Sequence, residues 1–189
     1  MLFRSAICHA AALAIANAGL FEREQESVRA TQLLNDIAAR TAASLDLDEV
    51  VEAAVDELRQ LIPFEDFSLV LLDGGRIGRV LSSRGRGDAL VGITLGDLDT
   101  GFVERIMAER VAVLRLPADS PLPEGSGALD GLQAAAIIAL PSDTGLLGAL
   151  NLVSSAANAF AGIDRRLLER VGTQLSLAIK NAQLYDEIK

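Results

Sequence analysis

The residues best suited to chemistry at neutral pH are few in this sequence and lie at its N-terminus. There is one cysteine, Cys8, and one histidine, His9. A disulfide, a CxxC pair or a zinc quartet needs more thiols or imidazoles than these two residues supply. A histidine-dependent catalytic triad would have to use His9. The single cysteine fits a reducing compartment, so we expect a cytoplasmic protein.

Carboxylates and arginines offer two further patterns. Asp97 and Asp99 could suggest a metal site or an acid–base pair, but they lie in a loop before an expected helix, where Asp is favoured as an N-terminal cap. Four arginines form a small cluster in a chain of net charge −9, namely Arg76, Arg79, Arg84 and Arg86. A nucleic-acid site needs more positive charge or interleaved aromatics. We therefore predict no catalytic residue, no metal and no nucleic-acid partner.

The first twenty residues imitate a secretory signal. They are apolar, and Ala16-Asn17-Ala18 resembles a cleavage site. Polar residues within the stretch make it a poor membrane span, so we expect no membrane insertion. The ten residues from Leu13 recur from Leu177 with six identities, and a signal has no place at a C-terminus. We interpret both copies as the closing helix of one module type, with the signal peptide as the alternative.

The repeat defines the predicted domains. Residues 1–30 are expected to be a linker helix, the tail of an upstream module, and residues 31–189 a complete module. Both copies carry a heptad pattern typical of paired helices. One seam is the predicted homodimer interface: Ile7, Ala11, Ala14, Ala18, Phe21, Val28, Leu168, Val171, Leu175, Ala178, Ala182 and Tyr185.

A second apolar face of the C-terminal helix needs a different explanation. It consists of Leu167, Leu177, Leu184 and Ile188. Two apolar faces suggest that one packs on the chain's own sheet and the other on a partner. An ordinary amphipathic helix that packs only on its own sheet is the alternative.

Hydrophobic periodicity predicts the remaining elements. We expect helices over 5–43, about 48–62, 100–110 and the C-terminus, and strands over 67–72, 76–84, 111–116, 135–140 and 146–153. One helical turn is expected over 128–132. Tight turns at 73–76 and 142–145 favour antiparallel pairing, so the predicted fold class is α+β.

Several segments, in this order, resemble the GAF domain family over residues 31–189. They are Leu33–Ala38, Leu45–Val50, Phe67–Asp73, Ile93–Gly96 before Gly101, Gly148–Leu152, and Phe160 with Asp164 and Leu167-Leu168. The resemblance implies an antiparallel sheet of five to six strands. It also implies long N- and C-terminal helices on one face of the sheet and a ligand pocket on the other.

Specialised branches of that family carry residues that this sequence lacks. Where the cyclic-nucleotide-binding branch has Asn-Lys, this chain has Ser154-Ser155, and Arg165 replaces that branch's Glu. The haem, bilin and methionine-sulfoxide branches need a histidine or cysteines in the pocket, whereas Cys8 and His9 precede the domain. We therefore predict no cofactor and disfavour haem and covalent bilin. An unidentified small-molecule ligand stays open.

The resemblance places the pocket over the second strand, the helix from Thr100 and residues 117–133. The predicted ligand-binding residues are Ser82, Arg84, Phe102, Arg105, Asp130 and Gln133. An arginine there could bind a carboxylate or phosphate through a bidentate fork. The alternative is that both arginines are solvated surface charges and that Phe102 belongs to the core.

These observations predict a non-catalytic sensory domain of a signal-transduction protein. It would bind a small molecule and relay its state through dimeric helices to an output domain, such as the histidine kinase of a two-component system. The alternative is a dimerisation and relay module without a ligand. An enzyme is disfavoured because no nucleophile and base form a matched pair.

Overall fold

The computed structural model divides the chain into two compact units, Met1–Asp36 and Ile37–Lys189. It describes residues 15–19, 47–73, 77–85, 91–92, 94–97, 100–116, 131–143 and 145–188, together with residues 21, 25, 28, 31, 32, 35, 36 and 39. The described residues before position 40 are all helical, in agreement with the helix predicted there. Among them, Phe21 and Val28 are exposed.

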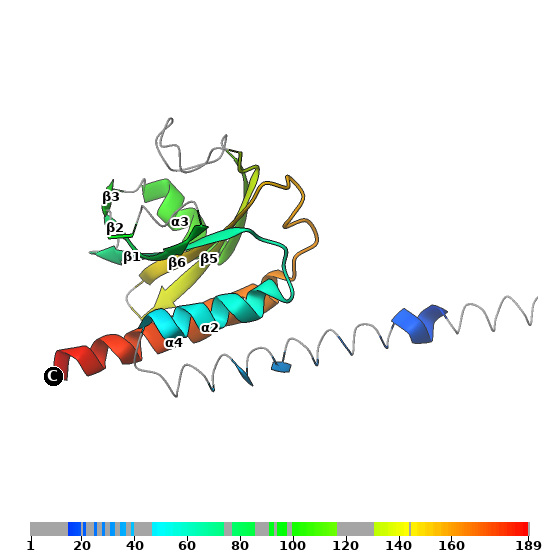
Figure 1. The fold of residues 1–189 in the computed structure, drawn as a ribbon, viewed down its shortest axis with the longest axis horizontal. Helices are drawn as coiled ribbons and strands as arrows, with labels where there is room; N and C mark the ends of the chain where they lie inside the picture. The colour runs from blue at the N-terminus through cyan, green and yellow to red at the C-terminus, as the bar shows by residue number, and fades with distance from the viewer. Residues whose placement is uncertain are drawn as a thin grey trace, which may run out of the picture. The chain divides into compact units, whose positions relative to one another are not determined.

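A single antiparallel sheet organises the second unit (Figure 1). The described residues form six strands in the order β3-β2-β1-β6-β5-β4. Their bounds are β1 Asp66–Asp73, β2 Ile77–Arg84, β3 Thr94–Asp97, β4 Val111–Arg115, β5 Ala134–Ser142 and β6 Gly145–Ser154. Every neighbouring pair is antiparallel. The predicted α+β class and strand number are confirmed.

Helices cover both faces of this sheet (Figure 1). Helices α2 (Leu47–Arg59) and α4 (Arg165–Ile188) pack against each other, and α4 also contacts β4, β5 and β6. Helix α3 (Thr100–Glu109) contacts the same three strands from the opposite face. We call the two sides the α4 face and the α3 face.

The α4 face holds the larger aliphatic core. Leu69, Leu150 and Ile138 are directly opposed across three adjacent strands, and all three are fully buried. Burial of such side chains stabilises a fold by about 1.5–3 kcal/mol each. Alternate residues of each strand therefore point to this face, where they pack against the helices.

The same packing corrects the predicted dimer seam. In α4 the seam residues Leu168, Val171, Leu175, Ala178 and Ala182 are all buried within one chain. They are therefore core residues of the second unit and do not offer a surface to a partner. The second apolar face, which we expected to lie on the sheet, instead exposes Leu177 and Leu184. Because the two faces sit one residue apart on the helix, periodicity alone could not tell which of them the sheet would take.

Of the other seam residues, Ala18, Phe21 and Val28 are helical and exposed. The structure describes the backbone of Tyr185 as helical. Ile7, Ala11 and Ala14 lie outside the described residues, so their role remains a prediction.

Three contacts at four-residue intervals fix α4 on the sheet. A Cβ added to Gly172 would lie 2.3 Å from the carbonyl oxygen of Ala139, so the helix and β5 meet backbone to backbone. One turn later, the buried Ser176 hydroxyl donates to the carbonyl oxygen of Pro141. One further turn on, Lys180 Nζ lies 2.8 Å from Asp143 Oδ2. We call Gly172, Ser176 and Lys180 the α4 ridge.

The last ridge contact gives a testable pH effect. The hydrogen bond and the charge of Lys180 hold the pKa of Asp143 below its usual value. Asp143 therefore stabilises the fold above the unfolded-state pKa of about 4, and this stabilisation is lost as the pH falls through the lower folded-state pKa. We expect Lys180→Met to raise the pKa of Asp143 toward its usual value in a carboxyl NMR titration. Arg170→Met, on an exposed part of α4, should leave that pKa unchanged.

The N-terminus of α4 explains part of the family-like pattern. Asp164 Oδ1 accepts from the backbone N–H of Arg166 at 3.0 Å and of Leu167 at 3.2 Å, which is an N-terminal cap. Phe160, four residues earlier, is buried and anchors the preceding turn. Both residues therefore have structural partners.

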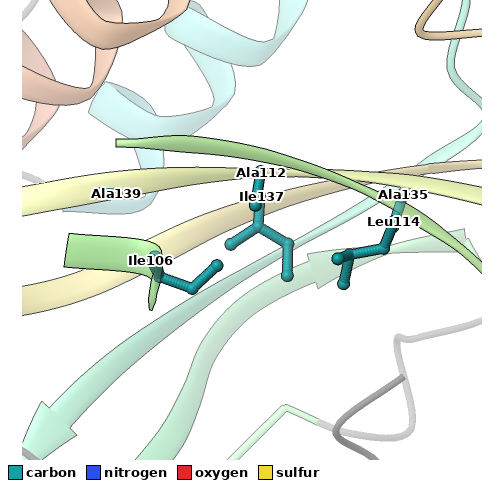
Figure 2. Packing of buried hydrophobic residues seen from close by; sticks show 6 residues of the cluster. All are labelled: Ile106, Ala112, Leu114, Ala135, Ile137 and Ala139. Atoms are coloured by element: carbon teal, nitrogen blue, oxygen red, sulfur yellow. The ribbon is translucent and has the colours of Figure 1, made fainter. Parts of the chain in front are cut away.

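The α3 face carries a second, smaller core. Ile106 of α3 packs with Ala112 and Leu114 of β4 and with Ala135, Ile137 and Ala139 of β5 (Figure 2). Phe102, Leu116, Leu146, Ala149 and Val153 are partly buried around them. The small alanines let α3 approach the sheet closely.

Two local features differ from the sequence predictions. Strand β3 was not predicted, since its four residues include a glycine and lack clear alternation. The helical turn predicted over 128–132 is not borne out at its described end, since Gly131 and Leu132 are not helical, while 128–130 lie outside the described residues. The described helices lack the combination of length and hydrophobicity that a membrane-spanning helix needs.

Candidate functional site

A row of polar side chains crosses the otherwise apolar α3 face. Direct pairings align Ser83 of β2, Ser68 of β1, Asn151 of β6 and Ile137 of β5. Residues directly opposed in an antiparallel pair point to the same face. Ile137 packs with Ile106 of α3, so the whole row lies on the α3 face of the sheet. We call Ser68, Ser83 and Asn151 the polar row.

Hydrogen bonds hold the polar row in place. Asn151 Nδ2 donates to the hydroxyl of Ser68 at 3.2 Å and to its backbone carbonyl at 3.4 Å. The buried hydroxyl of Ser83 donates to the carbonyl oxygen of Phe67 at 3.0 Å. Ser68 and Asn151 are only half-buried. Among the described residues, no buried side-chain nitrogen or oxygen lacks a hydrogen-bond partner.

The neighbouring rows give this face its electrostatic character. Val70, Ala149 and Ala139 form the row on one side. Asp66 is opposed to Val153 in the row on the other side. The carboxylate of Asp66 occupies the space that a Cβ on Gly85 would need, and Gly85 has a φ of 88°. Asp66 is the one charged side chain in these described sheet rows.

Two of the predicted ligand residues lie together on α3. Phe102 packs against the α3-face cluster. The guanidinium carbon of Arg105 lies 5.7 Å from the centroid of the Phe102 ring, within the range of a cation–π contact. Arg105 itself is exposed. These residues therefore sit at the outer edge of the α3 face, and Phe102 contributes to its core.

Ser82 and Arg84 lie on the other face of the sheet, which corrects their predicted place in the pocket. Ser82 is opposed to Leu69 of the α4-face core, and Arg84 forms an ion pair with Glu52 of α2. The cause is a β-bulge opposite Leu69 and Val70, which shifts the register of β2. Because of it, Val80 and Ser83 share the α3 face although they are three residues apart.

The remaining predicted residues are less informative. The side chain of Gln133 is exposed at the start of β5, where its backbone N–H donates to Ser154 and its carbonyl accepts from Leu116. Asp130 lies outside the described residues. The polar row itself was not predicted, although Asn151 stands between two leucines of the strand segment Gly148–Leu152. A polar residue between core leucines was the available signal.

The three residues that depart from the cyclic-nucleotide pattern have structural partners. The Glu65 carboxylate accepts from the Ser155 hydroxyl at 2.6 Å, from the Ser155 N–H at 3.1 Å and from the Ser154 hydroxyl at 3.3 Å. The guanidinium of Arg165 donates to the carbonyl oxygen of Val111 at 3.3 Å. Glu65 thereby joins the end of β6 to the start of β1.

This junction predicts a measurable stability effect. We expect Glu65→Gln to lower the free energy of unfolding by about 1 kcal/mol, because an exposed charged acceptor becomes a neutral one. Urea denaturation measures the change. Glu104→Gln, on the exposed side of α3, is the control and should stay within about 0.5 kcal/mol of the parent chain. Equal effects in the two variants would contradict the structural role of Glu65.

The described residues contain no group of three or more His, Cys, Asp or Glu side chains that could hold a metal ion. The hydroxyls and the amide of the polar row can orient a small polar ligand through hydrogen bonds.

Comparison with known proteins agrees with this geometry. The sequence profile described as GAF domain matches residues 44–180. A search of curated proteins found no match. Among solved structures, the GAF domain of a phosphoenolpyruvate-protein phosphotransferase from Coxiella burnetii is similar with a TM-score of 0.69 at 17% identity. That alignment covers 85% of this chain and 98% of the other.

Two further structures share the fold. The GAF domain of a two-component sensor histidine kinase from Bacillus halodurans has a TM-score of 0.60 at 20% identity, covering 76% of this chain and 99% of that one. The phycoerythrobilin-bound GAF domain of a cyanobacterial phytochrome has a TM-score of 0.65 at 16% identity, covering 85% and 99%. At these identities the likeness concerns the fold alone.

Proposed function

Because the chain belongs to the GAF domain family, we propose that it is a non-catalytic sensory domain that binds a small molecule on the α3 face. Its state would pass through α4 and a homodimer to an output domain of a longer signalling protein. The observation that carries the proposal is the half-buried polar row on a face that otherwise packs aliphatic side chains.

The polar row supports the ligand part of the proposal. A sheet face that served only to pack α3 would be more stable with apolar residues at these positions, since polar groups lose water on burial. Retaining hydroxyls and an amide there is typical of binding sites, where a few polar groups orient a ligand in apolar surroundings. Because the side chains of the polar row are uncharged hydroxyls and an amide, we propose a neutral polar ligand.

The β5–β6 hairpin supports the relay part of the proposal. On the α3 side, the methyl group of Met107 lies 3.8 Å from the position that a Cβ on Gly145 would occupy. On the α4 side, Pro141 and Asp143 of the same hairpin contact Ser176 and Lys180. A ligand that moved α3 would therefore act on the segment that fixes α4. For this to be allostery, the ligand must bind two arrangements with different affinity.

The alternative is a dimerisation and relay module with no ligand. The extensive burial of Ile106 and its neighbours favours it, because side chains of the chain itself already fill the space under α3. The two proposals differ in what they require of Asn151. A sensor needs its amide for recognition, whereas a relay would tolerate an apolar replacement or gain stability from it.

Native mass spectrometry of the purified full chain, intact and after denaturation, tests the proposal. We expect a dimer that carries additional non-covalent mass. Asn151→Leu, or the milder Ser83→Ala, should lose this mass and remain dimeric. Ser82→Ala is the matched control, because it changes a serine of the same strand that lies on the α4 face, and it should keep the mass.

The other results are equally informative. A dimer without extra mass, together with an unchanged or higher melting temperature in Asn151→Leu, would favour the ligand-free relay. Mass that persists in Asn151→Leu and Ser83→Ala but disappears in Ser82→Ala would move the site off the α3 face and contradict the proposal.

A further inference from the structure

The C-terminal half of α4 presents a stripe of exposed residues that the helix–sheet packing of the second unit leaves uncovered. Leu177 is 56% exposed and Leu184 is 58% exposed, and Asn181 between them is also exposed. Their intervals of four and three residues place them on one side of the helix. In a heptad, Leu177 and Leu184 take d positions and Asn181 the a position between them. We call these three residues the Leu177 stripe.

The packing of α4 keeps this stripe at the surface. Leu177 and Asn181 each precede a buried core residue, Ala178 and Ala182. The α4 ridge fixes the helix on β5 from the same side. The stripe cannot turn toward the sheet without breaking these contacts. Its cover must therefore come from outside this helix–sheet packing.

We propose that the Leu177 stripe pairs with the same stripe of a second copy, in a parallel two-helix seam. Leucine at d with a single asparagine at a is the pattern of a two-stranded coiled coil. A parallel twofold arrangement sets Asn181 opposite its own counterpart, so the two amides can bond to each other. Another register would bury each amide against leucine without a partner.

The distribution of charge along α4 is compatible with a second copy of the chain as the partner. From Thr173 to Leu184 the exposed residues of α4 are uncharged, and the one charged side chain in that span, Lys180, is paired with Asp143. Two copies can therefore meet here without like-charge repulsion, although each chain carries a net charge of −9. Toward the N-terminus of α4 the exposed Arg170 would face its counterpart, so the two helices should diverge there.

The seam is the surface through which the proposed homodimer would form. Its role in signal relay rests on the proposed function. The surface lies at the end of α4 that continues past the start of α2 (Figure 1). Parallel pairing brings the two C-terminal ends together. Output segments that follow would then be held side by side.

Sedimentation velocity of the full chain, over a wide range of protein concentration, tests the seam. We expect the parent chain to be a dimer. Leu177→Glu with Leu184→Glu should raise the dissociation constant about 30-fold or more, with an unchanged far-ultraviolet circular dichroism spectrum. Leu61→Glu is the matched control, since Leu61 is a 41% exposed leucine outside the stripe, and it should remain dimeric.

Two further variants test the geometry. In a Cys8→Ser background, Leu177→Cys and Leu184→Cys should each form a disulfide-linked dimer alone, as a parallel seam requires. An antiparallel pair would cross-link only when the two variants are mixed, which would overturn the proposed orientation. Asn181→Leu should tighten association about tenfold or more, because a buried polar residue at an a position weakens the pair. An unchanged dissociation constant would place position 181 outside the seam.

The outcomes separate this inference from the proposed ligand site. A parent chain that is monomeric overturns the seam, and bound mass on that monomer would leave the ligand proposal standing. A dimer that survives Leu177→Glu with Leu184→Glu, but dissociates with Phe21→Glu and Val28→Glu, would assign the interface to the N-terminal helix and overturn the stripe. A dimer that dissociates as expected but carries no mass supports the seam and contradicts the ligand proposal.

Discussion

Gly172→Ala is expected to lower the free energy of unfolding by about 2 kcal/mol. In an ordinary helix interior this change would raise stability by about 1 kcal/mol, since alanine is the better helix former. Here the new Cβ would lie 2.3 Å from the carbonyl oxygen of Ala139 and 3.0 Å from a methyl of Ile138. Because the closer atom belongs to the backbone, α4 and β5 must separate, and such overpacking costs about 3 kcal/mol.

Urea denaturation measures this effect, and Thr173→Ala provides a neighbouring control. Thr173 is exposed, and its hydroxyl donates to the carbonyl oxygen of Glu169 within the same helix. Its removal should change stability by no more than about 0.5 kcal/mol. A rise in the stability of Gly172→Ala would show that the helix is not held backbone to backbone, and would remove the first contact of the α4 ridge.

The second large effect is expected from Ile106→Ala. Ile106 is the fully buried residue of α3, and Ala112, Ala135 and Ala139 beneath it are too small to fill the resulting cavity. We expect a loss of about 3 kcal/mol, in the usual range for large aliphatic residues replaced by alanine. Faster amide hydrogen exchange should accompany it in α3, because this helix loses its main anchor.

Ile106→Val is the conservative control for this prediction and should cost about 1 kcal/mol. Met107→Ala, at a half-buried neighbour that approaches Gly145, should cost less than Ile106→Ala and should affect the β5–β6 hairpin. If exchange in α3 stays slow in Ile106→Ala, the helix is held by contacts other than this cluster, and the account of the α3 face would need revision.

The regular elements of the second unit could be predicted because their signals are local. Each of these signals depends only on residues close by in the sequence. Examples are the apolar run from Phe67 to Leu72, the hairpin turns and Asp164 before the last helix. The need for glycine at position 148 also has a clear cause, since a Cβ there would lie 2.2 Å from the carbonyl oxygen of Val70. A glycine before alternating leucines thus indicated a strand that passes close to its neighbour.

The faces of the elements could not be predicted in the same way. In α4, two apolar stripes lie one residue apart, and the choice between them depends on where Gly172 permits close approach. In β2, the bulge moves Ser83 onto the α3 face and Ser82 away from it, and nothing in the sequence of β2 itself marks the shift. The predicted site depends on that register, and it therefore names Ser82 and Arg84 in place of Ser83.

The α4 ridge also fixes the rotation of α4 about its own axis. It thereby sets the direction in which any helix that continues from α4 presents its side chains. With three points of one helix side held on β5 and the turn that follows it, the direction of each later residue around the helix axis follows from its sequence position alone, at about 100° per residue. Inserting one residue after Ala182 would swing a following helix by that angle, whereas inserting seven would change it by only about 20°. Chimeras that join this domain to another helical output should therefore tolerate spacers of whole heptads and fail with the lengths in between.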